Sequence, residues 1–168
     1  MKTKVIALTG ILFSLTLIIG TIENLIPPII PALPFVKIGL SNIVITFSLI
    51  ICGFWPTLII AIGKSIIVPL FVGNPMMIAY SLMPTIIALT ITYFFLKTKK
   101  IGIPTIGAIS AITHNILQLS VASIIMSTIT VFGFAPYLIV TGCLSGFITG
   151  LISILLVKYL PNSIILFD

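Results

Sequence analysis

The sequence predicts an all-α membrane protein, in which residues 1–168 form a single bundle of six transmembrane helices. Three observations support this prediction: 60% of the residues are hydrophobic, only 6% are charged, and the mean hydropathy is +1.41. A soluble domain uses about 25% charged residues to cover its surface. The composition therefore excludes a soluble protein, and the length fits one compact bundle within a lipid bilayer.

The first helix is expected at about residues 5–22, because a bilayer core of about 30 Å needs roughly 20 helical residues. Glu23 and Asn24 end this apolar run. The loop that follows, at about 24–38, contains several prolines, which lack a backbone N–H and restrict the preceding residue. Since the loop is apolar, we expect it to lie on the bundle as an outer lid rather than in water.

Five further helices are expected, separated by turns that contain proline, glycine or lysine. They are predicted at about residues 39–54, 57–72, 76–96, 104–131 and 137–159. The breaks between them are Trp55-Pro56, Gly73-Asn74-Pro75, the Lys97 to Lys100 cluster and Gly133-Phe134-Ala135-Pro136.

The lysines predict the orientation of the bundle. With six spans, most of them lie on one side of the membrane: Lys2, Lys4, Lys97, Lys99, Lys100 and Lys158. Cytoplasmic loops are enriched in lysine and arginine, so both termini are expected in the cytoplasm. The net charge of +6 is explained in this way, and we expect no nucleic-acid partner.

Lys64 is expected near the middle of a span, where an ammonium costs at least about 2.5–3.5 kcal/mol to insert. The alternatives are snorkelling to the interface, a structural ion pair with Glu23, or a polar ligand site, which we favour. Glu23 could pair with Lys64 or with Lys37, which precedes the second helix, but one carboxylate cannot neutralise both. The excess positive charge favours an anionic ligand, although Lys37 could equally be a solvated loop residue.

The fifth expected helix carries a polar stripe of Ser110, His114 and Gln118, flanked by Thr113 and Asn115. Polar residues in a membrane helix turn inward, where they bond neighbouring helices or line a cavity. The depth of the cluster matches that of Lys64 and favours a binding site. His114 is the only histidine and has no suitably spaced partner, so we expect no metal and no cofactor.

Small residues at four-residue spacing allow close helix approach on the last expected helix, at Gly142, Gly146 and Gly150. Internal packing is the preferred interpretation there. On the first helix, Ala7, Gly10 and Ser14 form a shorter pattern of small residues. Docking onto a partner subunit and packing within the bundle are the two interpretations of that pattern.

The acidic residues are Glu23 and Asp168, and no phosphate-binding loop or metalloprotease motif is present. General acid–base chemistry and magnesium-assisted prenyl transfer therefore lack the necessary side chains. We expect no enzymatic activity, and ATP-driven transport would need other subunits.

Three segments resemble a known family: Glu23-Asn24-Leu25-Ile26-Pro27-Pro28, Phe35-Val36-Lys37-Ile38-Gly39-Leu40-Ser41-Asn42-Ile43 and Thr113-His114-Asn115-Ile116-Leu117-Gln118. They resemble the bacterial Gx transporter family, often labelled heptaprenyl diphosphate synthase component I, and the resemblance covers nearly the whole chain. That family is similar in architecture to the substrate-binding S components of energy-coupling factor (ECF) importers.

The resemblance implies an S component in a bacterial plasma membrane that binds a small anionic micronutrient or precursor. Carried over by position, the binding residues are Glu23, Lys37, Asn42, Lys64, His114, Asn115 and Gln118. The first helix would contact a transmembrane coupling subunit that recruits ATPase subunits. The family more often has arginine at position 64, and lysine lacks the planar fork for bidentate recognition. An accessory subunit of heptaprenyl diphosphate synthesis and a stand-alone secondary carrier are the alternatives.

Overall fold

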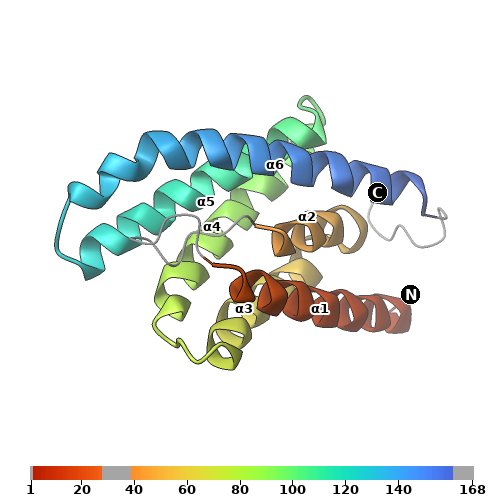
Figure 1. Cartoon of the computed structure of the whole chain (residues 1–168). Coiled ribbons are helices and arrows are strands. Elements are labelled where there is room, and N and C mark those ends of the chain that lie inside the picture. Colours follow the sequence, from red (N-terminus) through yellow and green to blue (C-terminus); the bar gives the residue numbers. More distant parts are fainter. Residues whose placement is uncertain (1, 28–38, 161–168) are drawn as a thin grey trace.

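The computed structural model describes residues 2–27 and 39–160, which form helices joined by turns (Figure 1). The elements are α1 (Lys2–Leu25), α2 (Ser41–Cys52), α3 (Phe54–Phe71), α4 (Met77–Thr98), α5 (Ile103–Ile125), the 3₁₀ helix η1 (Thr130–Phe134) and α6 (Ala135–Lys158). The predicted all-α membrane bundle of six α-helices is confirmed.

The six α-helices form a closed ring in which each packs against the helix on either side of it. Their order around the ring is α1, α2, α6, α5, α4 and α3, and α2 also contacts α3. In Figure 1, α6 lies along α5 and α2 on one side of the bundle, and α1 and α3 lie on the opposite side. A ring of this kind surrounds a central space to which every helix can contribute side chains.

Five of the helices, α1, α3, α4, α5 and α6, are long and apolar enough to cross a membrane. The second helix, α2, has only 12 residues and is therefore about 18 Å long, shorter than the predicted 39–54. Gly53 ends α2 with a φ of +81°, a conformation that glycine tolerates best, and α3 begins at the next residue. The expected break at Trp55-Pro56 lies inside the first turn of α3, because proline is tolerated there.

The turn between α5 and α6 also lies earlier than predicted, because α5 ends at Ile125 rather than near residue 131. Ser123 stabilises this turn by donating its hydroxyl to the carbonyl of Thr128 at 2.9 Å. The expected break at Gly133-Pro136 is instead occupied by η1 and the first turn of α6, where Pro136 needs no N–H partner.

Three glycines of α6 lie against α5. A Cβ atom at Gly146 would lie 2.7 Å from Cβ of Ala111 and 2.8 Å from Cα of Ala108, and one at Gly150 would lie 2.7 Å from Cα of Pro104. At Gly142 it would lie 2.6 Å from the side-chain amide of Asn115. At Gly146 and Gly150 the two backbones therefore approach so closely that only glycine fits, which fixes the face of α5 that packs against α6.

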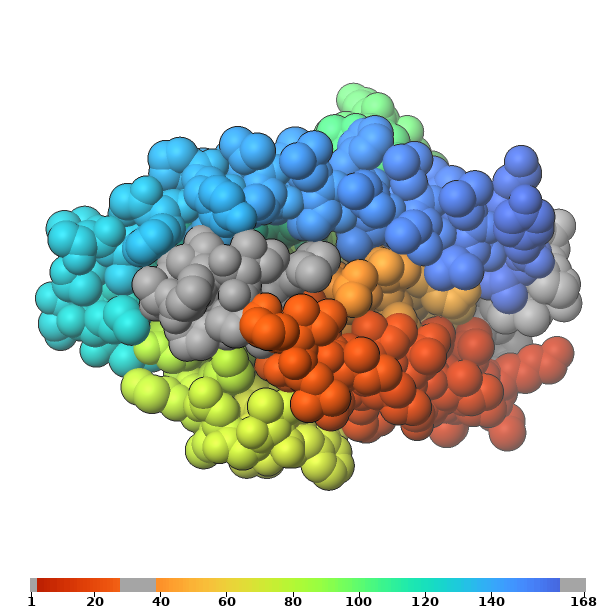
Figure 2. Space-filling model, in the orientation of Figure 1, coloured from red at the N-terminus to blue at the C-terminus, as the bar shows by residue number. Residues whose placement is uncertain are grey.

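The small residues of α1 lie on the outside of the bundle. Ala7, Gly10 and Ser14 are exposed, and a Cβ at Gly10 would meet no atom within 4 Å. Figure 2 shows α1 along one edge of the molecule and α6 along the opposite edge. This surface of α1 is therefore open to lipid or to another subunit.

Candidate substrate-binding site

A cavity of about 130 Å³ lies inside the ring, and all six α-helices line it. One end of it is bounded by the end of α1, the start of α2 and the end of α3, and its lining extends from there to Thr92 of α4 and Gly107 of α5. Lys97, Lys99 and Lys100 lie at the C-terminal end of α4 and in the turn that follows it. The lining is unusually polar for the interior of a membrane protein, which is expected at a functional site.

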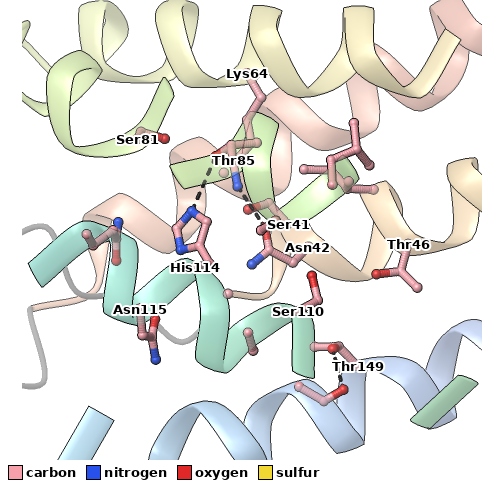
Figure 3. A pocket seen from close by; sticks show the side chains of 18 of the residues that line it. Ser41, Asn42, Thr46, Lys64, Ser81, Thr85, Ser110, His114, Asn115 and Thr149 are labelled. Atoms are coloured by element: carbon pink, nitrogen blue, oxygen red, sulfur yellow. Dashed lines mark hydrogen bonds between the residues drawn. The ribbon is translucent and has the colours of Figure 1, made fainter. Parts of the chain in front are cut away.

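Lys64 extends from α3 toward the centre of this cavity (Figure 3). Its ammonium donates a hydrogen bond to Oδ1 of Asn42, at 3.1 Å, in the first turn of α2. This is its only hydrogen bond to a residue in the ranges 2–27 and 39–160. Within the same ranges, no carboxylate oxygen lies within 4.0 Å of the ammonium. The described partner of this part-buried cation is therefore neutral.

Glu23 stabilises the start of α2 rather than forming an ion pair with Lys64. Its side chain is 4% exposed, and its carboxylate accepts the backbone N–H of Gly39, of Leu40 at 3.2 Å and of Ser41 at 3.3 Å. The Ser41 hydroxyl adds a fourth hydrogen bond at 3.1 Å. A carboxylate from α1 therefore caps α2, where free N–H groups and the helix dipole favour negative charge. Lys37, the other lysine considered for Glu23, lies outside the described residues.

The polar stripe of α5 faces the cavity. Ser110, His114 and Gln118 all line it, and Nε2 of His114 lies 3.3 Å from the Thr85 hydroxyl of α4. Figure 3 shows Ser110 and His114 pointing into the same space as Lys64 and Asn42.

Asn115 also borders the cavity, but its side chain has a structural contact. Its amide nitrogen donates to the backbone carbonyl of Leu138 on α6 at 2.9 Å. The side-chain donor of Asn115 thus holds α5 to α6. Of the residues predicted for binding, the other described ones, Glu23, Asn42, Lys64, His114 and Gln118, are brought together around one space.

Several lining hydroxyls were not singled out from the sequence as binding residues. They are Ser41, Thr46, Ser81, Thr85, Thr92, Ser145 and Thr149. Serine and threonine in helices usually bond the carbonyl one turn earlier, so each alone indicates little. The useful signal was spacing, since Ser81 and Thr85 are four residues apart and share one face of α4.

A model of the family described as heptaprenyl diphosphate synthase component I matches residues 12–156. The chain belongs to this family. The match extends from α1 to α6 and includes every residue that lines the cavity. The predicted family is thereby confirmed, whereas the likeness to S components stays a prediction. No protein of curated function and no solved structure matches the chain.

Proposed function

We propose that this chain is the substrate-binding membrane component of an ECF-type importer that takes a small anionic micronutrient or precursor into a bacterial cell. The observation that carries the proposal is Lys64, a cation inside a polar cavity whose described partner is the neutral amide of Asn42. A charge in a membrane interior is costly unless it is paired or solvated. An anionic substrate would supply the missing negative charge.

The position of the cavity supports uptake from outside the cell. Its end near Glu23 and Asn42 is remote from Lys97, Lys99 and Lys100. If lysine-rich turns face the cytoplasm, this end of the cavity belongs to the outer half of the membrane. A substrate that enters this half must then be released inward, and coupling to ATPase subunits would drive that step.

The family name favours a second candidate, an accessory component of heptaprenyl diphosphate synthesis. The residue inventory argues against a catalytic role, because the chain has only two acidic residues. One of them, Glu23, is already bonded to the N-terminus of α2. Magnesium bound to a diphosphate needs carboxylate ligands. The cavity is also small, since an engineered cavity of about 150 Å³ holds one benzene molecule, and a heptaprenyl chain is far longer.

Affinity purification of the tagged full chain from its native membranes tests the proposal. We expect a transmembrane coupling protein and ATPase subunits to co-purify, and these partners to be lost in Gly10→Phe. The variant should still fold, because no atom lies within 4 Å of a Cβ at Gly10. Co-purification of a prenyl diphosphate synthase subunit instead would establish the second candidate. A chain that purifies alone and transports without ATP would be a secondary carrier.

A further inference from the structure

The charges around the cavity can be counted from its described lining. Two described lining residues, Glu23 and Lys64, have side chains of a type that is ordinarily charged at neutral pH. The negative charge of Glu23 is stabilised by three backbone N–H groups and the Ser41 hydroxyl at the start of α2. His114 is counted as neutral, because an imidazolium would share a buried cavity with the ammonium of Lys64. Among residues 2–27 and 39–160, the positive charge of Lys64 has no anionic partner within hydrogen-bond distance.

The ammonium of Lys64 still has hydrogen-bonding capacity. A lysine ammonium has three N–H donors, and Asn42 accepts one of them. Two donors remain, which suits the two oxygens of a carboxylate. Asn42 is also replaceable as a partner, since a charged acceptor forms a stronger bond to an ammonium than a neutral amide does.

The rest of the lining sets the size and polarity of the occupant. The volume of about 130 Å³ is close to that of the benzene-binding cavity of about 150 Å³. Ile45, Leu49 and Leu89 supply apolar walls, and Ser110 and Gln118 on α5 supply neutral hydrogen-bonding groups. A ring-sized body with one charged end fits this combination.

From these observations we infer that the cavity takes a ring-sized monocarboxylate, whose carboxylate binds Lys64 in place of Asn42. This inference rests on the proposed function in assuming that the cavity is the substrate site. It goes further by matching the charge of the substrate to the one lysine among the described lining residues. Dianions and diphosphates are disfavoured, because their additional charge would have no cation among the described lining residues.

Four probes that differ chiefly in charge test the inference: benzoate, its neutral isostere benzamide, the dianion phthalate, and pyrophosphate. Binding to the purified full chain in lipid nanodiscs is measured by calorimetry. Benzoate is expected to bind at least about tenfold more tightly than each of the others. Lys64→Met should abolish benzoate binding. The heat that remains with this variant measures the partitioning of benzoate into lipid and is subtracted. Lys100→Met is the matched control, because Lys100 is exposed and lies outside the cavity lining.

A second variant, Asn42→Asp, keeps the test decisive if Lys64→Met fails to fold. It places a carboxylate where the Lys64 ammonium already donates to Oδ1. The internal ion pair should remove benzoate binding without lowering the unfolding temperature. Equal binding of benzamide, tighter binding of phthalate or pyrophosphate, absence of Lys64-dependent benzoate binding, or retained binding in Asn42→Asp would each overturn the inference. If coupling subunits still co-purify in those cases, the proposed function stands with a substrate of a different charge.

Discussion

The capping of α2 by Glu23 predicts a specific loss of stability in Glu23→Gln. The substitution keeps the size of the side chain but removes its charge. One glutamine oxygen can still accept the N–H groups of Gly39 and Leu40, which now bond Oε1. The amide nitrogen then replaces Oε2 and faces the N–H and hydroxyl of Ser41, which are both donors. The buried N–H of Ser41 is left without an acceptor.

The size of the effect follows from the hydrogen bonds that change. A bond to a charged group contributes about 1.5–3 kcal/mol, and loss of a helix N-cap costs about 0.5–2 kcal/mol. We expect Glu23→Gln to lower the free energy of unfolding by about 2–3 kcal/mol. For a chain of this length, that corresponds to a fall of roughly 5–10 °C in the unfolding midpoint.

Cys52 provides the assay, because it lies at the C-terminal end of the helix that Glu23 caps. Its side chain is 7% exposed, whereas the other cysteine, Cys143, is exposed. In a Cys143→Ser background, a thiol-reactive dye should label Cys52 only when α2 separates from the bundle. Thermal scans with this dye then report the unfolding midpoint directly.

Asp168→Asn is the charge-matched control, since it makes the same acid-to-amide change at the only other acidic residue. Ser41→Ala should have a smaller effect, about 1 kcal/mol, because it removes one neutral donor and leaves the backbone bonds intact. If Glu23→Gln and Asp168→Asn show the same Cys52 labelling midpoint, the carboxylate does not hold α2 and the capping argument is wrong.

Three further outcomes are expected. Gly146→Ala should destabilise the chain by about 1–3 kcal/mol and lower the dye-labelling midpoint, because its Cβ would lie 2.7 Å from that of Ala111. Gly10→Ala is the control, because a Cβ there meets no atom within 4 Å, and its midpoint should be unchanged or slightly raised. Equal midpoints for the two variants would contradict the close approach of α5 and α6. A fluorescent protein fused after residue 168 should fluoresce and an alkaline phosphatase fused there should be inactive, and the reverse would show that the lysine-rich turns face outward. Asn42→Asp should raise the dye midpoint, and a lower midpoint would show that Lys64 does not pair with the new carboxylate.

The fold was largely predictable because lipid imposes a simple rule on the sequence. Long apolar segments must be helical in a membrane, so their number follows from composition and breakers. The boundaries were less predictable, and Pro56 and Pro136 show why. Both were interpreted as breaks, yet each lies in the first turn of a helix, where the missing N–H has no partner to lose. The true ends of the preceding helices depend on Gly53 and on the Ser123 hydroxyl.

The sequence predicted those site residues whose side chains are energetically unfavourable in lipid, and it did not predict the residues that are common in membrane helices. Lys64, His114 and Gln118 stood out because polar side chains at that depth require partners. Thr85 and Ser81 did not, because hydroxyls are common in membrane helices and can bond their own backbone. The partner of Glu23 could not be deduced from the residue types. Its acceptor sites are filled mainly by backbone N–H groups, which are identical at every non-proline position.

The shortness of α2 and the chemistry of the cavity have one common explanation. Because α2 begins at the cavity, its free N–H groups lie where a buried carboxylate can reach them. Its first turn is thereby tied to α1 through Glu23 and Ser41, and to α3 through Lys64 and Asn42. An anion on Lys64 competes with the second tie and leaves the first intact. Substrate binding would therefore change the restraint on the start of α2 while Glu23 keeps that helix end in place.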